Sequence, residues 1–223
     1  MRFRSLFLRL LLTAVASVAP NAFPAAQAGY ANLAQLGKFL IIPSAVILIA
    51  AMFSLRSRTP QIASALWRGA IAGALATVAL EAIRYTGFRL GFMPGNLPEL
   101  MGVLLADRFA LGPSTWSTVL GFIYHFWNGA CFGMIFALWL SRRPIWWATS
   151  YGILIGLVFL VSPVVESLGV GFMGRDFGWH FATTVVVAHL AFGTALGFLL
   201  RVGSANLRSH RDRSESCPFE RSR

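Results

Sequence analysis

The sequence has little charge: only 12% of its 223 residues are Asp, Glu, Lys or Arg, whereas 57% are hydrophobic. A soluble domain has about 25% charged residues, which coat its surface. Here the charges are too few to cover a soluble globule, and the hydrophobic residues come in runs long enough to cross lipid. The composition therefore predicts an all-α integral membrane protein, because open strands in lipid would leave backbone groups unpaired.

Cysteines and known catalytic signatures are also scarce. Cys131 lies in an apolar run and Cys217 in a basic tail, and they form no CxxC pair. This placement argues against a disulfide framework. The sequence contains no nucleophile elbow, P-loop, HExxH motif or Rossmann fingerprint, so it gives no positive sign of an enzyme.

The charge that is present is strongly basic, with a formal net charge of +11. A basic soluble protein would suggest nucleic acid as the partner. The arginines here stand in short clusters between apolar runs, which is the pattern of the positive-inside rule. The predicted partner is therefore the lipid bilayer, and nucleic acid is not expected.

Residues 1–28 have two interpretations. Arg2 and Arg4 precede an apolar stretch, and Ala26-Gln27-Ala28 fits an A-x-A cleavage site before Gly29. These are the parts of a secretory signal. The same residues also suit a first membrane helix that is not cleaved, so the segment is either a signal peptide or a membrane anchor.

Further apolar runs follow, each close to the ~20 residues that cross hydrocarbon. Five transmembrane helices are expected after cleavage, or six without it, at 36–55, 62–85, 116–140, 145–168 and 180–201. Arginines at Arg56–Arg58, at Arg142–Arg143 and after Arg201 should face the cytoplasm. The sequence thus predicts a multi-pass protein of the bacterial inner membrane with a cytoplasmic C-terminus.

Two other segments differ from these spans. The loop 86–115 contains LMGVLLADRF, which is apolar but too short to span and predicts an outer-surface or re-entrant helix. The basic stretch 204–223 predicts a disordered cytoplasmic tail. Between the first segment and the tail, the chain divides into 29–61, 62–140 and 141–203.

The regions 62–140 and 141–203 resemble each other in sequence. Each contains, in the same order, a GxxxG pair, a glutamate, GFM, and then H-x3-G-x3-G. This recurrence predicts two copies of a helical hairpin, parallel to each other and related by a pseudo-twofold axis along the membrane normal. Glycines four apart let helices approach closely, so helix packing is assigned to Gly69, Gly73, Gly129, Gly133, Gly152, Gly156, Gly193 and Gly197.

The repeat also places ionisable side chains at equivalent positions, Glu81 with His125 and Glu166 with His189. A charge at mid-bilayer costs about 2.5–3.5 kcal/mol on insertion scales, so such residues face the bundle interior and find partners. Glu81 has Arg84 three residues away as a structural partner. Glu166 has no such neighbour, which makes it the stronger functional candidate.

Several hypotheses fit these residues. Acid and histidine pairs carry protons or cations in transporters, a path here assigned to Glu81, Glu166, His125, His189, Asn128 and Tyr124. His125 and His189 could instead ligate haem, or Glu81, His125, Glu166 and His189 could hold a metal. Without such a role, the histidines are polar contacts between helices, in a scaffold that associates with itself or with another membrane subunit.

Three stretches carry a resemblance to a known group: HFWNGACFGMIFA at 125–137, YGILIG at 151–156 and HLAFGTALGFLLR at 189–201. LPELMG at 97–102 adds to them. Over roughly 90–201 the chain resembles YagU-like bacterial inner-membrane proteins and related families of unknown function. The resemblance implies a small helical bundle in the inner membrane and a loose association with acid tolerance. It implies no catalytic residue.

Overall fold

A computed structural model describes the backbone of residues 2–215 and the side chains of residues 3–202. In this part of the chain every regular element is helical. The longer helices are α1 (Arg2–Gln27), α3 (Ile42–Arg58), α4 (Pro60–Arg89), α6 (Thr115–Leu140), α7 (Ile145–Leu160) and α9 (Trp179–Glu215). The shorter ones are α2 (Leu33–Leu36), a π-turn η1 (Gly37–Ile41), α5 (Leu97–Leu105), η2 (Phe109–Leu111), α8 (Pro163–Ser167) and η3 (Phe172–Gly174).

Among the described residues, five helical segments are long and apolar enough to cross a membrane. They are Phe3–Gln27, Leu33–Arg58, Pro60–Arg89, Thr115–Leu140 and Trp179–Val202. Large apolar side chains also cover their outer faces; on α3, for example, Val46 and Phe53 are exposed. An apolar exterior of this kind suits contact with lipid. The prediction of a helical membrane protein is confirmed at this level.

The run predicted as one span at 145–168 is not continuous. It forms α7, which is only 16 residues long, and then the short helix α8. Ser162 between them is extended, with ψ 158°. The break lies immediately before Pro163, which lacks the N–H that would continue the α7 ladder and restricts the residue before it to extended backbone.

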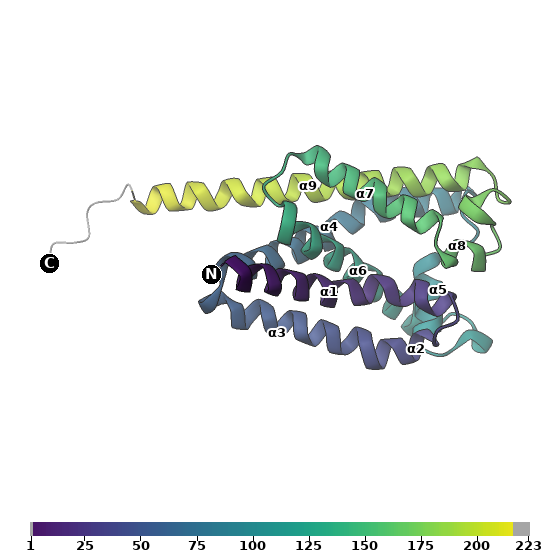
Figure 1. Cartoon of the computed structure of the whole chain (residues 1–223). Coiled ribbons are helices and arrows are strands. Elements are labelled where there is room, and N and C mark those ends of the chain that lie inside the picture. The colour runs from purple at the N-terminus through teal and green to yellow at the C-terminus, as the bar shows by residue number, and fades with distance from the viewer. Residues whose placement is uncertain (1, 216–223) are drawn as a thin grey trace.

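The arginine-containing turns lie at one end of the bundle. Figure 1 shows the start of α1, the α3–α4 turn, the α6–α7 turn and the C-terminal part of α9 at this end. We call it the arginine end, and call the opposite end, with segments 28–33, 90–114 and 161–178, the loop end. α9 continues to Glu215, beyond residue 204 where the predicted disordered tail begins; residues 216–223 lie outside the described part.

The predicted re-entrant segment is α5, which packs along the first turns of α6. Pro98 stands in its first turn. A Cβ added at Gly102 would clash with the carbonyl oxygen of Ser117, and one at Gly121 with that of Pro98. The two backbones are therefore in close contact, and α5 becomes part of the bundle at the loop end.

The core consists of several apolar clusters. Leu12, Ala16 and Phe23 of α1 are buried with residues of α3, α4, α5 and α6. A second cluster joins α4, α6, α7 and α9. α4 and α6 belong to both, so this helix pair forms the centre of the bundle, and α1 contributes to the interior like any other helix.

Candidate functional site

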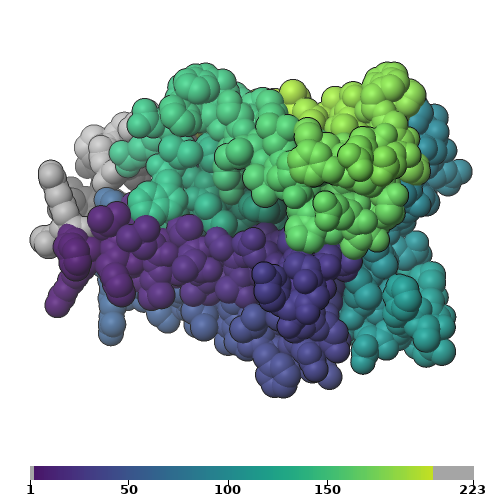
Figure 2. Space-filling model, turned by 45° about the vertical axis from the view of Figure 1, so that its right-hand side comes forward, coloured from purple at the N-terminus to yellow at the C-terminus, as the bar shows by residue number. Residues whose placement is uncertain are grey.

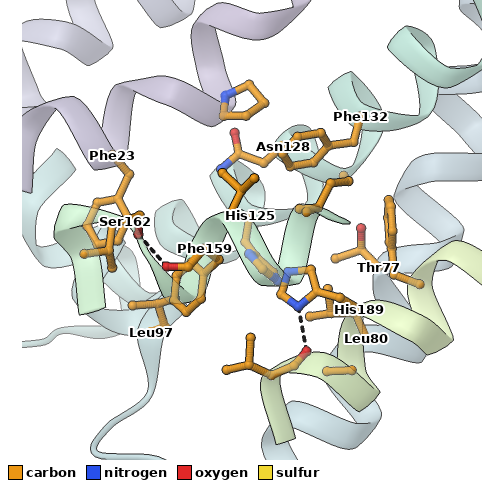
Figure 3. A pocket seen from close by; sticks show the side chains of 18 of the residues that line it. Phe23, Thr77, Leu80, Leu97, His125, Asn128, Phe132, Phe159, Ser162 and His189 are labelled. Atoms are coloured by element: carbon orange, nitrogen blue, oxygen red, sulfur yellow. Dashed lines mark hydrogen bonds between the residues drawn. The ribbon is translucent and has the colours of Figure 1, made fainter. Parts of the chain in front are cut away.

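A cavity of about 370 Å³ lies inside the bundle. Its walls come from α1, α4, α5, α6, α7, α8 and α9 and are mostly apolar. Figure 3 shows His125, Asn128, Thr77 and His189 among the apolar side chains that surround it. This volume is within the usual range for small-molecule sites, about 300–1,000 Å³. The polar groups that line it are Asn21, Thr77, Arg84, His125, Asn128, Tyr151, Ser162 and His189.

Glu81 and Arg84 form an ion pair on α4. Arg84 Nε lies 2.6 Å from Glu81 Oε1, and Nη2 lies 2.7 Å from Oε2. Nη2 also donates to Asn96 Oδ1 at 3.0 Å. Residues three apart on a helix face each other, so the pairing follows directly from the sequence. The Arg84 side chain is only 5% exposed, which makes this pair part of the interior.

His125 brings α6 to the same pair. Its Nε2 lies 2.9 Å from Glu81 Oε1. His125 is ten residues into α6, roughly 15 Å from the loop end. The predicted pairing of Glu81 with His125 is therefore present, with Arg84 as a third member.

His189 has different surroundings. Its Nδ1 lies 2.8 Å from the carbonyl oxygen of Val185, and its ring stacks on Phe159 with centroids 6.2 Å apart. A Cβ added at Gly156 would lie 3.0 Å from the imidazole. The glycine therefore makes room for the ring. Nδ1 can donate to that carbonyl, which leaves Nε2 as the acceptor of a neutral imidazole.

The predicted pairing of Glu166 with His189 does not form. Glu166 is exposed on α8 and does not line the cavity. Where His125 meets Glu81, His189 meets Gly156. Because the helix breaks before Pro163, Glu166 lies beyond the end of α7 and cannot continue its inner face.

The glycine contacts show how the two hairpins differ, and those of the first hairpin match the prediction. A Cβ added at Gly69 would clash with Gly133, and one at Gly73 with Gly129, so α4 and α6 touch through both predicted pairs. The close approach of the two backbones leaves no room for a side chain at these positions.

In the second hairpin the helices also touch, but with a different register. Equal copies would place Gly197 opposite Gly152, whereas Gly197 lies against Ala148, and Gly152 lies against His189 and Gly193. Relative to α4 on α6, α7 is displaced along α9 by about two helical turns. The duplication stays a prediction, and the two hairpins are not packed identically.

The residues predicted to hold a metal do not form a ligand cluster. Within the described part of the chain, no three His, Cys, Asp or Glu side chains are close enough together to hold a metal ion. Glu166 is exposed on α8, and the other three predicted ligands, Glu81, His125 and His189, do not form such a group either. For haem, the Nε2 atom of His125 lies 2.9 Å from Glu81 Oε1, so the carboxylate stands where an iron ligated by this nitrogen would need space.

Tyr124 and Asn128 also differ in position. The Tyr124 hydroxyl donates to the carbonyl oxygen of Ala19 in α1 at 2.7 Å, and this side chain does not line the cavity. Asn128 lines it and is 9% exposed. Only Asn128 can therefore contact a molecule in the cavity.

Some lining residues were missed by sequence reasoning. α1 contributes Pro20, Asn21, Phe23 and Pro24 to the cavity. The two prolines and the asparagine interrupt an otherwise apolar run, and this was the available signal. Arg84 was considered only as a partner of Glu81, although it lines the cavity itself.

No protein-family model, curated protein or solved structure gives a significant match to the chain. The YagU-like resemblance therefore stays a prediction.

Proposed function

We propose that the protein binds a small, largely apolar molecule inside the bundle and takes it up from the surrounding bilayer. The cavity is the observation that supports this proposal. Its walls are mostly apolar, and Arg84, His125 and Asn128 add polar groups to them. Sites of this composition bind molecules with an apolar body, which the few polar groups orient.

The sides of the cavity support uptake from lipid. α1 and α7 face each other across it and have little direct backbone contact. Leu154 and Val158 of α7 line the cavity and are each 57% exposed, and Asn21 of α1 is also exposed. Figure 2 shows the surfaces of α1 and α7 along a seam on this face. An apolar molecule in the bilayer can therefore enter between the two helices.

We propose further that α1 is retained and that six helices cross the membrane. Ala16 and Ala19 of α1 are fully buried. Cleavage after Ala28 would expose the partners of these residues and remove one wall of the cavity. An uncleaved α1 has its arginines at the arginine end, and the positive-inside rule places that end in the cytoplasm of a bacterial inner membrane.

A proton or cation path is a second candidate. The contact between His125 and Glu81 favours it, because two exchangeable groups lie 2.9 Å apart beside the cavity. Glu166 is not part of this path because it is exposed on α8, and Tyr124 is not part of it because its hydroxyl donates to the carbonyl oxygen of Ala19. Glu81 is neutralised by Arg84, which makes binding of an apolar molecule the better supported function.

Photolabelling tests the proposal. The full chain in lipid nanodiscs would be irradiated with an alkyl diazirine, and labelled residues mapped by mass spectrometry. Labels are expected on lining residues of α7 such as Ile155. Ala188→Phe fills the cavity and should remove them, whereas Val187→Phe, on the exposed face of α9, should not. Val158→Trp at the opening should also reduce labelling. Equal labelling in all variants would overturn the proposal.

A further inference from the structure

We infer that the polar groups of this cavity recognise an uncharged head group carrying both a hydrogen-bond acceptor and a donor, such as a hydroxyl or an amide. This inference rests on the proposed binding function and specifies its ligand. Three side chains that line the cavity have a buried polar atom without a hydrogen-bond partner among the described residues. One is His125 Nε2, which lies 2.9 Å from Glu81 Oε1 outside hydrogen-bond geometry. The other two are Arg84 Nη1 and Asn128 Oδ1.

Both atoms belong to deeply buried side chains that line the cavity. Arg84 is 4% exposed and Asn128 is 9% exposed. Buried polar atoms are nearly always paired, and each exception calls for an explanation. A guanidinium N–H can only donate and an amide oxygen can only accept. A head group that satisfies both must accept from Arg84 and donate to Asn128.

The charges explain why this head group is uncharged. The guanidinium of Arg84 is already paired with Glu81 through two contacts, and Glu81 also meets His125. A carboxylate or phosphate head would compete with Glu81 for the same cation. An ammonium head would be placed beside Arg84. Either charge would be desolvated without a counter-ion of its own, which is costly in a buried site.

The remaining polar wall agrees with a neutral ligand. His189 Nδ1 lies 2.8 Å from the carbonyl oxygen of Val185, and in the neutral tautomer that donates from Nδ1 the Nε2 atom is an additional acceptor. The exposed apolar residues Leu154 and Val158 lie where a hydrocarbon chain would leave the cavity toward lipid. The ligand class is therefore a single-chain or small lipid with a hydroxyl or amide head.

A matched series of photoprobes tests this assignment. All four probes have the same diazirine-bearing chain and end in a primary alcohol, a methyl ether, a carboxylate or a trimethylammonium group. The full chain is labelled in phosphatidylcholine nanodiscs, and labels on α7 are quantified. The alcohol is expected to label the cavity about tenfold more than the charged probes, and more than the ether, which cannot donate.

Two variants assign the head group to its partners. Asn128→Leu should remove the advantage of the alcohol over the ether, because it deletes the acceptor. Arg84→Lys keeps the charge beside Glu81 but deletes Nη1, and should lower labelling by both. Val187→Phe is the control for general lipid labelling.

The outcomes separate the inference from the proposed function. Strongest labelling by the carboxylate or the trimethylammonium probe overturns the inference, and so does equal labelling by all four; in each case binding within the cavity stands. If no probe labels the lining residues of the wild-type chain, the proposed function fails and the inference falls with it.

Discussion

The hydroxyl of Tyr124 donates a hydrogen bond of 2.7 Å to the carbonyl oxygen of Ala19, and so joins α6 to α1. Both residues are buried, and the contact links segments that are far apart in the sequence. α1 is thus held by a specific polar contact as well as by apolar packing.

Tyr124→Phe removes this contact with little change in volume. We expect a loss of about 0.5–1.5 kcal/mol in the free energy of unfolding, measured by denaturation in detergent. Tyr30→Phe is the matched control, because Tyr30 is 84% exposed and its loss should be neutral. Equal stability of both variants would mean that the contact is not formed.

Retention of α1 can be measured directly. The intact mass of the purified protein is expected to include residues 1–28, because α1 supplies buried core residues and part of the cavity wall. Reporter fusions after Arg58 and Arg143 should both score cytoplasmic. A mature protein that starts at Gly29 would contradict the six-helix arrangement, and an outside score for either fusion would contradict the orientation.

The two glutamates should respond differently to substitution. Glu81→Gln leaves Arg84 buried without its counter-ion, and we expect the free energy of unfolding to fall by about 3 kcal/mol. Glu166→Gln changes an exposed side chain and should stay within about 0.5 kcal/mol of wild type. The reverse order would restore Glu166 as the functional carboxylate.

The displaced register of the second hairpin predicts which cysteine pair can form a disulfide. In a background without Cys131 and Cys217, Ala148→Cys with Gly197→Cys should cross-link on mild oxidation. A Cβ at Gly197 would lie 3.0 Å from that of Ala148, so the two backbones need to separate only slightly to reach the roughly 3.5–4.5 Å of a disulfide. Ala148→Cys with Arg201→Cys, the pair that equal hairpins would bring together, should not. Gel mobility with and without reductant distinguishes the two.

Much of the fold could be predicted from hydropathy, because lipid requires long apolar helices and little else. The positions of the turns could be predicted from the arginine and glycine residues. The register of α7 on α9 could not be predicted from the sequence. Ala148 serves as a small contact residue as well as glycine does, and a GxxxG pattern does not indicate which residues of the partner helix it contacts. The fate of Glu166 depended on that register and on the break before Pro163, so the sequence repeat suggested a symmetry that the side chains do not follow.

The shortness of α7 has a consequence for the membrane itself. Its 16 residues rise about 24 Å, which is less than the roughly 30 Å hydrocarbon thickness of an average bilayer. In the proposed six-helix arrangement, the bilayer beside α7 must thin to match it, at a modest cost per ångström of mismatch. Because the proposed opening to the cavity lies along this helix, the least ordered lipid around the protein is expected to stand at that opening.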